Sequence, residues 1–142
     1  MKNQKKNNSY VVAIPSYKRY NILYNQTLHT LFKNKINPSI IYVFLASKTE
    51  KKLYINSLKN IVDNKSKNSK TSSKSKNSKT SSKSKNYKNI SNAEKEFLKN
   101  VIFVVGKKGL KNQRNFINSF FPENVHILQL DDDIKDILQL DY

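Results

Sequence analysis

The chain has 142 residues, no cysteine and a formal net charge of +17, from 27 Lys and Arg residues against 10 Asp and Glu residues. This length provides for one domain with a single hydrophobic core. The absence of cysteine excludes disulfides, thiolate nucleophiles and Cys-type zinc sites. The two histidines, His29 and His126, are far apart in the sequence, which argues against a histidine-rich metal site.

No apolar run approaches the length that a membrane-spanning helix needs. The basic start of the chain is followed by only a few apolar residues before Pro15, too few for a secretory signal. We therefore expect a soluble intracellular protein, in the cytoplasm or, if it is viral, in the host cytoplasm, with no membrane partner. Nothing in the sequence indicates the oligomeric state.

The positive charge is concentrated in two places. Residues 64–89 contain nine lysines and no acidic residue, and the first six residues contain three more lysines. Five of the ten acidic residues fall within the last twelve positions. The excess charge therefore belongs mainly to a basic N-terminal tail, residues 1–8, and to an internal segment, whereas the C-terminal end is acidic.

In the first part of the chain, apolar runs predict strands over 10–14 and 40–45, and two amphipathic helices follow them. The first helix is expected over 21–35, with Asn21 as its N-cap. The second is expected to start at Thr49–Glu50. The residues predicted to face the core are Tyr24, Leu28, Leu31 and Phe32 in the first helix, and Leu53, Tyr54, Leu58, Ile61 and Val62 in the second.

Residues 67–75 are repeated without a mismatch as residues 76–84, in a pattern of Lys, Ser, Thr and Asn. Such a repeat has no apolar group to bury and cannot offset its ordering entropy, so we predict a disordered insert over 64–89. The insert could bind a nucleic acid or another polyanion, because clustered lysines release counterions from phosphates. We favour the alternative, a repeat expansion tolerated in a surface loop, since the insert lacks aromatic residues interleaved for base stacking.

After the insert, Ser91–Glu94 has the form of a capping box and predicts a short helix through Leu98. A buried strand is expected over 101–105, followed by a helix over 110–121 with Leu110, Ile117 and Phe121 on one apolar stripe. A fourth strand is expected over 125–130. Strands alternating with helices predict an α/β fold: a mostly parallel, Rossmann-like sheet of about four strands with flanking helices, formed by residues 9–63 and 90–142.

The fourth strand ends in three carboxylates, Asp131, Asp132 and Asp133. A cluster of carboxylates can bind a divalent metal, because hard cations prefer oxygen ligands. The alternative is that the three residues favour the N-terminus of a short terminal helix over 134–138. A calcium loop is excluded, because the triplet lacks the turn glycine and the distal glutamate.

Other polar candidates also follow predicted strands, where ligands of such sheets bind. Pro15–Arg19 follows the first strand. The third strand leads to Gly106–Gly109, which we interpret as a strand-to-helix turn rather than a phosphate loop, and then to Gln113–Asn115. The only two arginines of the chain, Arg19 and Arg114, lie in these segments, and a guanidinium suits bidentate phosphate recognition.

Taken in order, these segments resemble the nucleotide-sugar-binding half of GT-A glycosyltransferases. More narrowly, the chain is similar to the TET-associated glycosyltransferases of phages and large DNA viruses. Apart from the tail and the insert, the resemblance covers nearly the whole chain. The segments that carry it are Ile14–Arg19, Thr27–Leu31, Glu50 with Tyr54, Gln113–Ile117 and Leu130–Ile134.

The resemblance implies a metal-dependent glycosyltransferase that binds a nucleotide sugar, with a UDP-sugar as the expected donor. Asp133, together with Asp131, would ligate Mn²⁺ or Mg²⁺ at the diphosphate. The residues that would contact the nucleotide sugar are Pro15, Ser16, Tyr17, Arg19, Arg114, Asn115, Asp131 and Asp132.

GT-A enzymes place their acceptor site after this Asp motif, whereas the chain ends at Tyr142. The resemblance therefore assigns no catalytic base. It leaves open whether the protein is a truncated enzyme, one half completed by a partner, or an inactive fragment. The alternative function is polyanion binding through residues 64–89.

Overall fold

The computed structural model describes residues 9–63 and 90–138. The tail predicted over 1–8 and the disordered insert predicted over 64–89 lie outside the described residues. Within the described ranges, no helix combines the length and apolar character that crossing a bilayer requires.

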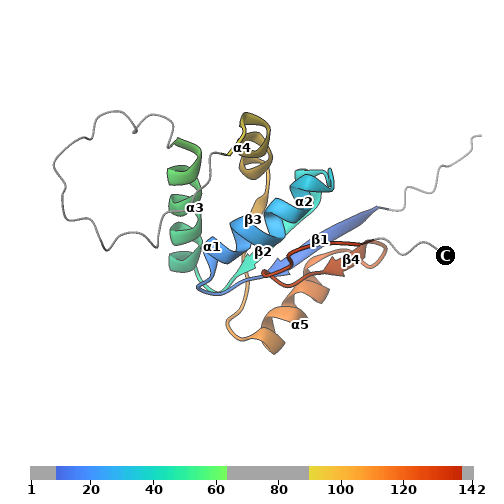
Figure 1. Ribbon diagram of the computed structural model, residues 1–142. Helices are drawn as coiled ribbons and strands as arrows, with labels where there is room; N and C mark the ends of the chain where they lie inside the picture. Colours follow the sequence, from blue (N-terminus) through green and yellow to red (C-terminus); the bar gives the residue numbers. More distant parts are fainter. Residues whose placement is uncertain (1–8, 64–89, 139–142) are drawn as a thin grey trace, which may run out of the picture.

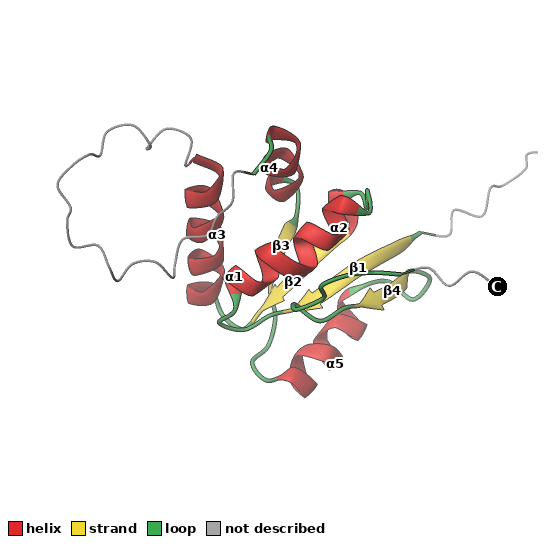
Figure 2. Ribbon diagram, viewed as in Figure 1, coloured by secondary structure: helices red, strands yellow, loops and turns green. Residues whose placement is uncertain are grey.

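The described chain alternates strands with helices (Figure 2). The elements in chain order are β1 (Tyr10–Pro15), α1 (Tyr20–Ile22), the π-helical turn η1 (Leu23–Leu28), α2 (His29–Lys33), the 3-10 turn η2 (Pro38–Ile40), β2 (Ile41–Leu45), α3 (Lys48–Asp63), α4 (Asn92–Lys99), β3 (Ile102–Val105), α5 (Leu110–Phe120) and β4 (His126–Gln129).

The four strands form one sheet in the order β3-β2-β1-β4, and every pair is parallel. In the register, Val12 lies opposite Ile41 of β2 and opposite Leu128 of β4. Consecutive strands β1, β2 and β3 step in one direction, and the connection through α5 then brings β4 to the other side of β1. The predicted α/β class with a parallel four-stranded sheet is confirmed.

Helices cover both faces of the sheet, with α1 to α4 on one side and α5 on the other (Figure 1). The strands alternate accordingly. Val12 and Ile14 of β1 belong to the large core beneath α1–α4, whereas Ala13 packs with Ile117 of α5. The two edge strands are less covered than β1 and β2, because neither β3 nor β4 has a fully buried residue.

The first helical segment differs from its prediction. It starts at Tyr20, and Arg19 rather than Asn21 occupies the N-cap position, without a side-chain cap. The reason lies in the preceding turn, where Lys18 has a positive φ of 55° and directs the chain into the helix, so that the N-cap lies two residues earlier than predicted. The π-helical turn η1 was also not predicted, since a 3.6-residue pattern does not reveal one inserted residue.

Two residues expected in the core face solvent instead. Leu53 of α3 is 52% exposed and Leu110 of α5 is 61% exposed. Leu110 stands in the first turn of α5, which overhangs the ends of the strands, so the helix reaches the sheet only from Gln113 and Ile117 onward. The Ser91 cap is confirmed, because its hydroxyl accepts a hydrogen bond from the Glu94 backbone N–H at 3.2 Å.

Candidate functional site

A pocket of about 560 Å³ lies where the strands end, within the range of roughly 300–1,000 Å³ that is usual for small-molecule sites. Segments that follow all four strands contribute to it. Its lining residues are Pro15, Ser16, Tyr17 and Arg19 after β1, Ala46 after β2, Lys107, Lys108, Gly109, Leu110 and Gln113 after β3, and Asp131, Asp132 and Asp133 after β4.

The position of this pocket follows from the strand order. The chain leaves β1 towards β2, whereas the chain leaving β3 crosses to β4 on the opposite side of β1. The connections therefore diverge beyond the carboxyl ends of β1 and β4 and leave a crevice between them. Open parallel sheets bind their ligands at such a point of reversal.

The segment after β1 is fixed to its neighbours by backbone hydrogen bonds. The Ser16 N–H donates to the carbonyl of Phe44 at 3.1 Å, and the Lys18 N–H donates to the buried carboxylate of Glu50 on α3. The exposed Tyr17 ring remains in the pocket wall, with Lys18 Nζ lying 5.1 Å from its centroid. Tyr17 therefore offers an aromatic face beside a cation.

A buried hydrogen-bonded chain connects α3 to the aspartate triplet. The Arg19 backbone N–H donates to the Tyr54 hydroxyl at 3.0 Å, and that hydroxyl lies 2.7 Å from Ser16 Oγ. Ser16 in turn donates to Asp132 Oδ2 at 2.8 Å. Because the single Ser16 proton goes to Asp132, the Tyr54 hydroxyl is the donor to Ser16.

Tyr54 is kept neutral by its surroundings. Burial raises the pKa of its phenol above the ordinary value of 10.0. The hydrogen bonds with Ser16 and with the Arg19 backbone oppose this rise, and the negative charges of Glu50 and Asp132 add to it. The phenol therefore serves as a hydrogen-bond donor in the neutral pH range.

The three carboxylates of the triplet have different environments. The Asp132 side chain is 7% exposed and points to Ser16, whereas those of Asp131 and Asp133 are 63% and 50% exposed. Arg19 contacts two of them, with Nη1 3.4 Å from Asp132 Oδ1 and Nη2 3.3 Å from Asp133 Oδ2. Arg114 Nη2 lies 3.4 Å from Asp131 Oδ1. Asp132 is thus anchored inside, and its two neighbours face outward.

The backbone of the triplet is held from the other side by two buried threonines. Thr27 Oγ1 donates to the Asp131 carbonyl at 2.7 Å and accepts from the Ile134 N–H at 2.8 Å. Thr30 Oγ1 lies 3.2 Å from the Ile134 carbonyl and 3.1 Å from that of Lys135. Through residue 138, no helix follows the triplet. The alternative that the aspartates cap a terminal helix over 134–138 is therefore wrong.

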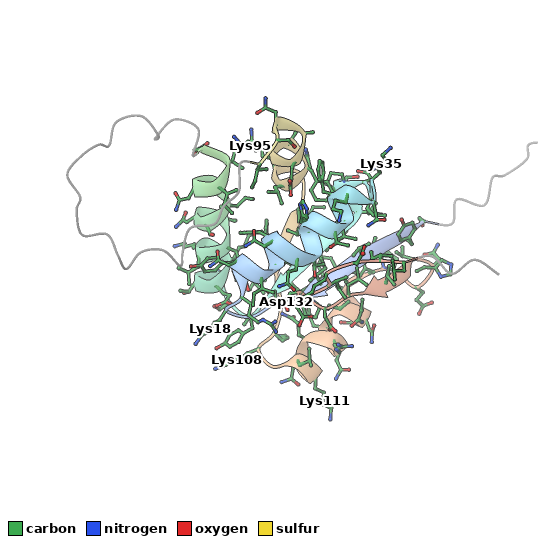
Figure 3. The ribbon with its side chains drawn as sticks, in the orientation of Figure 1. Lys18, Lys35, Lys95, Lys108, Lys111 and Asp132 are labelled. Atoms are coloured by element: carbon green, nitrogen blue, oxygen red, sulfur yellow. The ribbon has the colours of Figure 1, made fainter. Side chains whose placement is uncertain are left out.

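The connection between β3 and α5 forms the basic wall of the pocket. Figure 3 shows Lys18 and Lys108 on the side of the molecule where the strands end, near Asp132. Gln113 Oε1 accepts from the Lys107 N–H at 2.8 Å and packs directly on Gly106, where a Cβ atom would lie 2.0 Å from that oxygen. Gly109 turns the chain into α5 with a φ of +94°. The segment is a strand-to-helix turn, as predicted.

The carboxylates of the pocket can hold a divalent cation only if a bound ligand supplies further oxygen atoms. Within residues 9–63 and 90–138, no group of three or more His, Asp or Glu side chains is arranged to hold a metal ion. Asp131 and Asp133 are nevertheless exposed on the pocket wall. One or two carboxylates completed by substrate phosphates are a usual way to hold Mg²⁺. The donor set therefore fits a metal that arrives with a diphosphate.

The structure brings most of the predicted site residues together. Pro15, Ser16, Tyr17, Arg19 and the aspartate triplet all line the pocket. Arg114 reaches the triplet through its ion pair with Asp131. Asn115 does not line the pocket; it lines a separate hollow on α5 together with Lys107, Lys108, Asn112, Phe116 and Ser119.

The sequence interpretation gave no role to the residues that hold the site in place. Tyr54 was predicted as a core residue, and the hydroxyls of Thr27 and Thr30 were not assigned. A usable signal was present, because the buried stripe of Tyr24, Leu28 and Leu31 is interrupted by these two threonines. Polar side chains on a buried helix face need hydrogen-bond partners elsewhere in the fold.

Compared with known proteins, the chain matches no protein-family model, no curated protein and no solved structure.

Proposed function

We propose that this domain binds a nucleotide sugar together with Mn²⁺ or Mg²⁺, as the donor-binding part of a metal-dependent glycosyltransferase of GT-A type. The observation that carries the proposal is the convergence of Arg19, two lysines and the aspartate triplet on one pocket at the carboxyl ends of the strands, with Arg114 paired to Asp131 beside it. Opposite charges placed side by side suit a ligand that is itself an anion paired with a cation.

In this proposal, each group of residues has a separate task. Tyr17, exposed and planar, would stack on the nucleobase. The cationic wall of Lys107 and Lys108 would contact phosphate oxygens. Asp133 and Asp131 would hold the metal, which neutralises charge on the diphosphate when it is bound. Asp132 would set their positions from inside the fold, through Ser16 and Tyr54.

The two arginines are placed to exchange partners when the ligand binds. Arg19 and Arg114 contact Asp133 and Asp131 at 3.3–3.4 Å. Such exposed ion pairs contribute little stability, about 0–1 kcal/mol each. The arginines can therefore turn to the phosphates of the donor while the carboxylates turn to the metal.

The experiment is a thermal-shift titration with Mn²⁺ and a series of UDP-sugars. We expect a rise in Tm that requires both components, and the loss of that rise in Asp133→Ala. Asp136→Ala is the matched control, because Asp136 is an exposed aspartate of the same segment whose carboxylate, within the described part of the chain, accepts from the neighbouring Ile137 N–H at 2.9 Å and does not line the pocket. Wild-type protein that shows no shift with any nucleotide sugar would contradict the proposal.

A further inference from the structure

We propose that Thr27 is a positioning residue of the donor site, because its hydroxyl closes the turn that carries the aspartate triplet. The inference rests on the proposed function for its ligand, and on the contacts of Thr27 for its geometry. Thr27 is fully buried and lies in the π-helical turn η1, far in sequence from the residues it contacts.

Thr27 bridges the two ends of the turn that carries the aspartates. Asp131 and Ile134 are the first and fourth residues of this turn. The Asp131 carbonyl accepts from Thr27 Oγ1 at 2.7 Å, and the Ile134 N–H donates to that same oxygen at 2.8 Å. One hydroxyl therefore bridges both ends of the turn.

This bridge determines how the carboxylates are presented. Asp132 and Asp133 are the two central residues of the turn, and both contact Arg19, but only the buried Asp132 is also bonded to Ser16. The Thr27 hydroxyl ties both ends of the turn to the buried helical segment. Without it the turn loses these two hydrogen bonds, and the Asp133 carboxylate is no longer fixed in its place on the pocket wall.

The π-helical turn explains why Thr27 can reach the triplet. A π turn inserts one residue into a helix and rotates the two flanking helical segments relative to each other, and such turns are frequent at functional sites. Here Thr27 lies within the π-helical turn and Thr30 in the α2 segment that follows it, and both contact the same terminal segment. Among the described residues, the hydroxyl of Thr30 is bonded to the carbonyls of Ile134 and Lys135, beyond the central residues of the turn.

Thr30 therefore supplies a matched control. Thr27→Val and Thr30→Val each remove one buried hydroxyl from the same helical segment and keep the side-chain shape. We expect both to lower Tm, but only Thr27→Val to weaken Mn²⁺-dependent binding of a UDP-sugar, by about 10- to 100-fold, as for groups that orient metal ligands. Thr27→Ser keeps the hydroxyl and should restore the affinity.

A second measurement does not depend on a ligand. Amide hydrogen exchange, followed by NMR, should show a protected Ile134 N–H in the wild type and faster exchange at this amide in Thr27→Val but not in Thr30→Val. If Thr27→Val does not fold, Thr27→Cys replaces it, because a thiol is only a weak hydrogen-bonding group.

Equal losses of affinity in the two valine variants, or an Ile134 amide that Thr27→Val leaves unchanged, would overturn the inference. Wild-type protein that binds no nucleotide sugar while its Ile134 amide is protected would instead overturn the proposed function, and the donor-binding role of Thr27 with it.

Discussion

Ser16 Oγ lies 2.8 Å from Asp132 Oδ2, although 116 residues separate the two in the sequence. Both side chains are buried, and the hydrogen bond joins the segment after β1 to the segment after β4. This hydrogen bond therefore connects the two sides of the candidate site. A charged acceptor makes this bond stronger than one between neutral groups.

Replacing Ser16 by alanine should lower the free energy of unfolding by about 1.5–3 kcal/mol, the cost of removing a hydrogen bond to a buried charged group. Urea unfolding followed by circular dichroism measures this difference. Ser119→Ala is the control, because the exposed Ser119 hydroxyl is bonded to the Phe116 carbonyl of its own helix, α5, and surface changes of this kind stay within about 0.5 kcal/mol. Equal effects in the two variants would show that the Ser16 bond adds nothing.

We expect Tyr54 to make the free energy of unfolding depend on pH in the alkaline range. Its folded-state pKa is raised above the unfolded value of 10.0, because burial disfavours the phenolate. The folded protein then holds the proton more tightly than the unfolded chain, so the stabilising contribution is fully present below pH 10.0 and is lost as pH rises towards the folded pKa. Tyr54→Phe should remove this loss.

The measurement is urea unfolding of the wild type and Tyr54→Phe at several pH values from neutral to alkaline. We expect Tyr54→Phe to be less stable at neutral pH, because Ser16 and the Arg19 N–H lose a partner. The gap between the two proteins should narrow only in the alkaline range. A gap that is constant with pH would contradict a raised pKa.

Arg114 should matter for binding more than for folding. Arg114→Gln breaks an exposed ion pair with Asp131 and should change the free energy of unfolding by less than about 1 kcal/mol. Under the proposed function it should weaken the Mn²⁺-dependent binding of UDP, measured by calorimetry. The control is Lys111→Gln on the same helix, whose side chain points away from the pocket in Figure 3. UDP affinity that falls equally in both variants would indicate only a general charge effect.

Gly106 is predicted to tolerate no side chain. An added Cβ would lie 2.0 Å from Gln113 Oε1, so Gln113 would have to release the Lys107 N–H. Gly106→Ala should therefore cost about 1–3 kcal/mol of stability, the usual range for overpacking. The Gly106→Ala/Gln113→Ala double variant should lose less stability than the two single variants lose in total, because the shorter side chain at position 113 removes the clash. Additive effects would place the strain elsewhere.

Deleting the Lys-rich segment, residues 64–89, distinguishes nucleotide-sugar binding from nucleic-acid binding. Replacing residues 64–89 by a short Gly–Ser linker should leave Mn²⁺-dependent nucleotide-sugar binding unchanged, because the proposed donor contacts all lie in the described segments that follow the strands. If the lysines bind nucleic acid, the same deletion should abolish a binding that weakens steeply with salt, measured by fluorescence anisotropy. Nucleic-acid binding that survives the deletion would exclude the repeat as its source.

The alternation of strands and helices could be predicted because each strand is a compact apolar run, and three of these runs end at Pro15, Gly106 or Asp131. The carboxylates at the end of β4 were also visible as a sequence feature. The difference in environment between Asp131, Asp132 and Asp133 was not, since three identical neighbours carry no signal for which of them turns inward. That depends on Ser16 and Tyr54, which come from distant elements.

The π-helical turn and the early start of α1 could not be predicted either, because both arise from backbone geometry that packing imposes. Lys18 has a positive φ without being a glycine, and its N–H is fixed by Glu50 of α3. Leu110 illustrates the converse error. Its spacing matched the apolar stripe of α5, but Leu110 lines the open pocket at the ends of the strands and stays exposed, whereas the buried residues of the helix are Gln113 and Ile117.

The position of β4 beside β1 has a consequence for folding. Strands β1, β2 and β3 can pair in the order in which they are connected, but β4 must pass the whole sheet to pair with β1. Pairings between such distant segments form late, because their loop-closure entropy must be overcome first. The aspartates after β4 therefore join Ser16 and Arg19 only when the last strand docks. A ligand of this site would then bind the completed fold alone and hold its final strand in place.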